Sequence, residues 1–110
     1  MKVAYIFSTV NAHYILSNMI VPQLENGNHG FTVAGMFFFV DNTLMLVKGN
    51  DIGERLAALA RKTGMLVMAC DKCAYDRKIA ESLVPEVALG CFPDLHAALQ
   101  GAGLDQVITL

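Results

Sequence analysis

The stretch CDKC at residues 70–73 holds the residue types most able to do chemistry in this chain. Two thiols three positions apart are compatible with a metal clasp, a redox dithiol, a structural disulfide, or one reactive sulfur beside a bystander. The apolar run MLVMA at residues 65–69 comes directly before it and predicts a buried strand. The chemistry would therefore begin where a strand ends.

A zinc site is one alternative, because four potential ligands follow the spacing C-x2-C-x17-C-x4-H, which that metal tolerates. These ligands are Cys70, Cys73, Cys91 and His96. The first two, however, lie between a strand and a helix and not on a zinc-knuckle turn. A chain of 110 residues also has enough core to fold without a metal. The alternative that stays open is a non-catalytic binding or assembly subunit of the same fold, whose three cysteines either bind zinc or are inert.

A redox dithiol and a structural disulfide fit the sequence less well. A thioredoxin-type CxxC follows an early strand and needs a later cis-proline strand, for which Pro85 is a poor candidate. Three cysteines is an odd number, and the N-terminal MKVAYIF is expected to form a strand and not a signal peptide. We therefore expect a cytoplasmic protein with reduced thiols.

Composition excludes two classes of partner. The net charge is -2, Lys and Arg are scattered, and there is no tryptophan, so the sequence has no electrostatic footprint for nucleic acid. No stretch approaches the roughly 18 apolar residues of a membrane span. Yet 55% of the residues are hydrophobic and the mean hydropathy is +0.46, which is apolar for a single domain over residues 1–110. We expect self-association to cover this excess.

The chain is expected to alternate strands and helices. The predicted strands are residues 2–7, 31–40, 65–69, 84–90 and 105–110. The predicted helices are residues 12–24, which Pro22 ends or kinks, 52–62, capped by Asp51, 71–83 and 93–101. Residues 41–51 form either a short helix or a loop. This alternation predicts an α/β fold: a three-layer α/β/α domain around a five-stranded, mostly parallel, flavodoxin-like sheet.

The expected strand order is 2-1-3-4-5, as in flavodoxin. In such sheets ligands gather beyond the carboxyl ends of the strands where the strand order reverses, here between the first and third strands. The first strand ends at Ser8 and Thr9, and the third ends at Cys70. The sequence therefore predicts a site where these residues meet.

Position is expected to activate the thiol of Cys70. The unpaired N–H groups and the dipole of a helix N-terminus favour a nearby anion, and only a thiolate is a good nucleophile. Lys72 and Arg77 would add positive charge, which Asp71 and Asp76 oppose. We expect a modest shift toward the thiolate and a sulfur open to solvent.

Three segments together resemble the DsrE/TusD-like family of small sulfur-relay proteins. They are FFFVDN at residues 37–42, LVMAC at residues 66–70, and Arg77. In that family a strand ending in cysteine runs into a helix that carries Arg, often Arg-Gly, and an apolar strand ends in Phe-Phe-x-x-Asp-Gly. The resemblance covers nearly the whole chain, including the DQVITL ending. Asn42 replaces the usual glycine, and Lys78 stands where a glycine often follows the arginine.

The resemblance implies a sulfur carrier or sulfurtransferase in which Cys70 accepts sulfur. Its thiolate would attack a donor persulfide, hold the outer sulfur as Cys–S–SH, and pass it to an acceptor thiol, without a metal or organic cofactor. The partners would be sulfur-donor and acceptor proteins or small thiols. The resemblance also implies a homo-oligomer, a trimer or hexamer, with a dimer as the smaller alternative.

Two further cysteines have open roles. Cys73 would either resolve a persulfide on Cys70 by forming a disulfide, or be a buried apolar residue of the helix. Cys91 follows the short fourth strand, which is expected beside the third strand, so that its sulfur would reach the same edge of the sheet or be structural.

Four polar residues complete the candidate site. His13 would help to deprotonate a thiol, or be solvated in the first turn of its helix. Ser8 and Thr9 would donate hydrogen bonds to a bound sulfur species, or cap that helix. Asp41 ends a strand at the same edge and would otherwise only cap the next segment.

Overall fold

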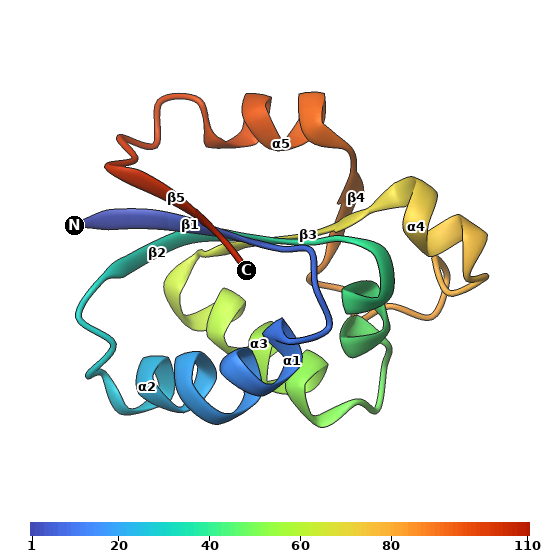
Figure 1. The fold of residues 1–110 in the computed structure, drawn as a ribbon, viewed down its shortest axis with the longest axis horizontal. Helices are drawn as coiled ribbons and strands as arrows, with labels where there is room; N and C mark the ends of the chain where they lie inside the picture. The colour runs from blue at the N-terminus through green and yellow to red at the C-terminus, as the bar shows by residue number, and fades with distance from the viewer.

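The computed structural model describes residues 1–110 as one five-stranded, all-parallel sheet with helices on both faces (Figure 1), which confirms the predicted α/β fold class. The strands are β1 (Lys2–Phe7), β2 (Thr32–Phe38), β3 (Leu66–Cys70), β4 (Ala88–Gly90) and β5 (Gln106–Thr109). The helices are α1 (Ala12–Ile15), η1 (Leu16–Ile20), α2 (Val21–Asn26), η2 (Val40–Leu46), α3 (Asp51–Thr63), α4 (Asp71–Asp76) and α5 (Phe92–Leu99).

The strand order is β4-β3-β2-β1-β5, so the predicted order 2-1-3-4-5 is wrong. The chain advances from β1 to β4 in one direction across the sheet and only then returns to β5, beside β1. Because parallel crossovers are right-handed, connections that advance together lie on one face, and the returning connection lies on the other. Figure 1 shows this arrangement, with α1, α2 and α3 below the sheet and α5 above it.

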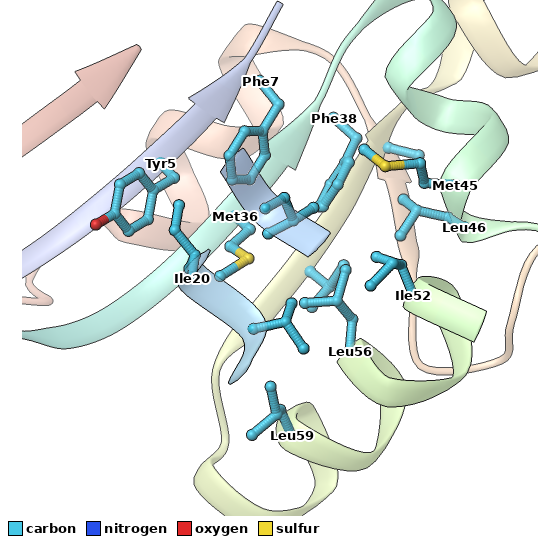
Figure 2. Close-up of a cluster of buried hydrophobic side chains, with 14 of the residues drawn as sticks. Tyr5, Phe7, Ile20, Met36, Phe38, Met45, Leu46, Ile52, Leu56 and Leu59 are labelled. Atoms are coloured by element: carbon cyan, nitrogen blue, oxygen red, sulfur yellow. The ribbon is translucent and has the colours of Figure 1, made fainter. Parts of the chain in front are cut away.

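The two faces of the sheet bury unequal cores. Twenty buried residues, among them Phe7, Phe38 and Leu56, pack between the sheet and the helices α1 to α3 (Figure 2). On the face that α5 covers, the core is a cluster of only five: Phe37, Met68, Cys70, Cys73 and Leu95. The cysteines of CDKC therefore belong to the thinner layer.

The first helical segment is longer than predicted and Pro22 does not end it. Residues 12–26 stay helical, with η1 wound as a π-helix directly before Pro22, which occupies the first turn of α2. Proline has no N–H to donate to the preceding turn, and it is tolerated at the start of a helix. The segment ends at Gly27, whose φ of 73° is left-handed.

The predicted helix 71–83 is also wrong in length, because α4 ends at Asp76. Lys78 takes a left-handed φ of 57°, and the chain then runs against the segment after η2. There Lys48 N–H donates to Ser82 O (2.8 Å) and Val84 N–H donates to Leu46 O (2.9 Å). These long-range hydrogen bonds replace the helical ones.

Helix α3 matches the predicted helix closely but its cap differs. Asn50, and not Asp51, caps it, and its Oδ1 accepts from the N–H groups of Ile52 (3.0 Å) and Gly53 (3.4 Å). Residues 41–51, which the sequence left open, begin in the 3-10 helix η2. None of the helices is both long and apolar enough to cross a membrane.

Candidate functional site

Cys70 and Cys91 lie at the ends of two neighbouring strands, and the segments that follow these strands run to opposite faces of the sheet. Cys70 ends β3, Cys91 follows β4, and Cys70 is in register with Gly90. After β3 the chain turns to the main core, to which Leu83 belongs, whereas after β4 it enters α5, whose Leu95 packs on the opposite face. In α/β sheets ligands bind where the connections of neighbouring strands diverge in this way. The site therefore lies between β3 and β4, and not between the first and third strands as predicted.

Three potential ligand atoms converge at the ends of β3 and β4. The sulfurs of Cys70 and Cys91 and a carboxylate oxygen of Asp71 all lie within 4.8 Å of one another. Cys73 and His96 are outside this group, although the sequence placed both in a zinc set. The residues that could hold a metal ion are thus Cys70, Asp71 and Cys91.

Cys73 faces a different neighbour. Its sulfur accepts a hydrogen bond from the backbone N–H of Val40 (3.2 Å), and its own N–H donates to the sulfur of Cys70 (3.5 Å). Val40 has a φ of 49°, an uncommon conformation for a β-branched residue. The strained turn after β2 therefore supplies a donor to the thiol cluster, and nothing in the sequence signals it, because valine normally avoids this conformation.

Burial overturns the expected activation of Cys70. Its side chain is only 2% exposed and that of Cys73 only 8%, whereas Cys91 is half-buried. The pKa of Cys70 is raised from 9.0 to about 11. Desolvation is the largest cause, the hydrogen bond from Cys73 N–H lowers the pKa, and the thiols of Cys73 and Cys91 raise it. A helix of six residues is a weak dipole. The expectation of an exposed, ionised Cys70 is therefore wrong.

The cationic residues of the CDKC segment pair with carboxylates. Arg77 contacts Asp41 through Nη2 (2.8 Å) and Nε (2.9 Å), and its Nη1 donates to Cys73 O (3.2 Å). Lys72 lies 3.5 Å from Asp76. Asp41 thus links η2 to the end of α4 in addition to standing in the first turn of η2. The pairing of Lys72 with Asp76 and of Arg77 with Asp41 offsets the positive charge that the sequence analysis expected beside Cys70.

The polar residues after β1 lie apart from the thiols. Ser8 N–H (2.6 Å) and Oγ (3.2 Å) and Thr9 N–H (3.3 Å) donate to Leu110 O at the end of the chain. β1 is separated from β3 by β2. His13 hydrogen-bonds to no thiol, and its buried Nε2 has no hydrogen-bond partner. The structure therefore does not bring these three residues together with Cys70.

Three aromatic rings border the thiol cluster, and the sequence analysis named none of them as part of the site. The Phe39 and Phe92 rings meet edge to face with centroids 5.1 Å apart, and both pack on Phe37, at 5.6 and 5.5 Å. Phe92 directly follows Cys91, and Phe39 directly precedes Val40. Adjacency to these residues was the signal available in the sequence.

The chain shares its fold with the ychN protein from E. coli. The crystal structure of that protein matches with a TM-score of 0.67 and 18% sequence identity over 100% of both chains. Two proteins of unknown function match with the same TM-score. MTH1491 from Methanobacterium thermoautotrophicum is 14% identical over 99% of this chain and 97% of its own. BT1422 from Bacteroides thetaiotaomicron is 10% identical over 99% of this chain and 94% of its own. No family model and no curated protein matches the sequence.

Proposed function

We propose that the protein is a sulfur carrier that holds sulfur as a persulfide on Cys70. The observation that carries the proposal is the proximity of the Cys73 and Cys91 thiols to that of Cys70 at the ends of β3 and β4. The resemblance to the DsrE/TusD-like sulfur-relay proteins, through the strand that ends in Cys70 and through Arg77, supports the same reading.

The transfer chemistry needs no cofactor. The thiolate of Cys70 attacks the outer sulfur of a donor persulfide, the S–S bond of the donor breaks, and the donor leaves as a thiolate. In the second step an acceptor thiolate attacks the outer sulfur on Cys70, which leaves as a thiolate in turn. Both steps are exchanges, so that no net oxidation occurs. The partners are donor and acceptor proteins or small thiols.

In this proposal the burial of Cys70 protects the persulfide that it carries. A persulfide enclosed beside Phe37, Phe39 and Phe92 is shielded from thiols in solution that would strip its outer sulfur. Loading requires the covering side chains to move, because the free thiol is 2% exposed. Cys73 is the proposed partner that orients the sulfur of Cys70 through its N–H.

Mass spectrometry tests the proposal. The reduced protein is incubated with a small-molecule persulfide, and the gain of one sulfur atom is mapped by peptide. We expect the addition on Cys70, and its loss in Cys70→Ser. Exchange of His96 for Ala, an exposed residue outside the cluster, is the control and should load normally. Addition confined to Cys91, the more open thiol, would contradict Cys70 as the carrier.

A further inference from the structure

The trio of Cys70, Asp71 and Cys91 has a property that sulfur carriage does not use. Its two sulfurs and one carboxylate oxygen come from the ends of two neighbouring strands and lie within 4.8 Å of one another. Persulfide transfer needs one sulfur at a time and has no use for a carboxylate. The convergence of three anionic donors on one point is instead the arrangement that a cation recognises.

We propose that Cys70, Asp71 and Cys91 form a binding site for a soft, thiophilic divalent metal ion of the class of Zn(II) and Cd(II). Thiolate ligands select such ions over Mg(II) and Ca(II). In a tetrahedral zinc site with Zn–S bonds of about 2.3 Å, two sulfurs are about 3.8 Å apart. The observed convergence within 4.8 Å is thus close to the required spacing. Three protein ligands leave the fourth position open.

The surroundings of the trio favour a cation from solution. Two thiolates and a carboxylate would bring three negative charges into a partly buried place. The nearest basic residues along the chain are engaged elsewhere, Lys72 with Asp76 and Arg77 with Asp41. A divalent metal ion would balance most of the charge, and its binding would release the thiol protons. Asp71 and Cys91 are half-buried, so the ion has access from their side.

Backbone contacts hold two of the ligands in place. Lys72 N–H donates to Asp71 Oδ1 (2.7 Å), which fixes the carboxylate and leaves Oδ2 free of protein partners. Cys91 N–H donates to Asp94 Oδ2 (2.9 Å) at the first turn of α5. Gly90 permits that turn to come close, because a Cβ there would lie 2.7 Å from the Cβ of Asp94. Such outer contacts orient metal ligands.

The site differs from the zinc set that the sequence suggested. Cys73 has its sulfur against the N–H of Val40, and His96 is exposed on α5. Both lie outside the trio, whereas Asp71, which the sequence analysis treated only as an opposing charge, lies within it. Cys73 can therefore serve as the matched control for Cys91, and His96 as a control outside the trio.

Titration with Cd(II) or Co(II) under reducing, oxygen-free conditions tests the site in the full chain. We expect one ion per chain, with thiolate-to-metal charge-transfer absorption. Cys91→Ser and Asp71→Asn should each weaken metal binding by more than about tenfold. Loss of a residue that merely orients a ligand already costs about tenfold or more in affinity, and loss of the ligand itself should cost more. Cys73→Ser keeps the backbone N–H that donates to the sulfur of Cys70 and should bind the ion far more tightly than Cys91→Ser. His96→Ala should bind like the parent.

Three results would overturn the metal site. They are no charge-transfer absorption in the folded, reduced protein, binding that survives alkylation of the thiols, and equal losses in Cys73→Ser and Cys91→Ser. Circular dichroism of each variant excludes unfolding as the cause of a loss. The proposal does not rest on sulfur carriage. Asp71→Asn should lose the metal and still accept sulfur on Cys70, so that the failure of either proposal is distinguishable from failure of the other.

Discussion

At Cys70 two physical effects on one thiol compete. The N–H of Cys73 favours the thiolate, and removal from water disfavours it. Desolvation is the larger effect, because the side chain lies under Phe37, Met68 and Leu95 and the helix behind it has only six residues. A buried thiol of this kind reacts slowly, so we expect its loading by a small-molecule persulfide to be slow as well.

The raised pKa of Cys70 predicts a slow and strongly pH-dependent alkylation. Only the thiolate reacts, so the rate for Cys70 in the metal-free folded protein should rise through a midpoint at about pH 11, above the ordinary 9.0. The raised pKa also makes the free energy of unfolding depend on pH. Because the thiol ionises at lower pH in the unfolded chain, the folded state loses stability as pH rises from 9.0 to about 11. Iodoacetamide labelling with peptide mapping measures the profile.

The same labelling contains its controls. Cys91 is half-buried and should be modified before Cys70 at every pH, and in denaturant all three cysteines should react alike. A midpoint for Cys70 at or below that of the denatured chain would contradict the burial argument. It would restore the activated thiolate that the sequence predicted.

The sequence predicted where Cys70 lies but not what surrounds it. An apolar run followed by CDKC is enough to place a cysteine at the end of a parallel strand. Burial of that cysteine depends on the turn at Val40 and on α5, which arrive from elsewhere in the chain. Asp71 was visible as a neighbour of Cys70, yet its convergence with Cys91 depends on β4 lying beside β3.

At the scale of elements, the sequence pattern predicted which segments are strands and helices better than it predicted the order of the strands in the sheet. The five strands and the helix α3 follow from apolar runs and periodicity. Strand order does not, because alternating strands and helices are compatible with several orders in the same fold class. Here β5 returns to the far side of β1, which sends α5 alone to the second face. The early end of α4 at Asp76 has the same kind of cause, since hydrogen bonds to the segment after η2 compete with the helix.

The contact between η2 and α3 makes a prediction at this scale. Gly53 lies in the first turn of α3, and a Cβ there would be 2.5 Å from Met45 O and 3.2 Å from Leu46 Cα. Gly53→Ala would gain about 1 kcal/mol of helix propensity but force two backbones apart, at about 1–3 kcal/mol. Because neither backbone can rotate away, we expect the upper part of that cost, and a net destabilisation of about 1–2 kcal/mol, measured by urea unfolding.

Helix propensity alone would give the opposite sign for Gly53→Ala. The exposed Ala58 of the same helix serves as the comparison, since Ala58→Gly removes propensity without any tertiary contact and should cost about 1 kcal/mol. An unchanged or more stable Gly53→Ala protein would show that η2 and α3 are not packed as closely as described.

At the scale of the whole molecule, the two faces of the sheet are unequally covered. One face carries α1, α2 and α3, and the other carries only α5 (Figure 1). Beside α5 a groove of about 580 Å³ opens toward β5, where Val107 is 50% exposed. The groove is lined by Pro93, His96, Ala97, Leu99, Gln100, Leu104 and Val107. Phe92 of α5 and Val107 are among the large apolar side chains that the structure leaves exposed.

We therefore expect the chain to self-associate through the α5 face, with a second copy covering the groove. Val107→Asp places a charge on the strand β5 at the groove and should shift the protein toward the monomer, because burial of an unpaired carboxylate is costly. Val107→Thr keeps the shape and the strand propensity and should shift it less. Size-exclusion chromatography with light scattering measures the states. A parent protein that is monomeric at high concentration would remove self-association as the reason for the apolar composition. An oligomer that withstands Val107→Asp would move the interface to another face.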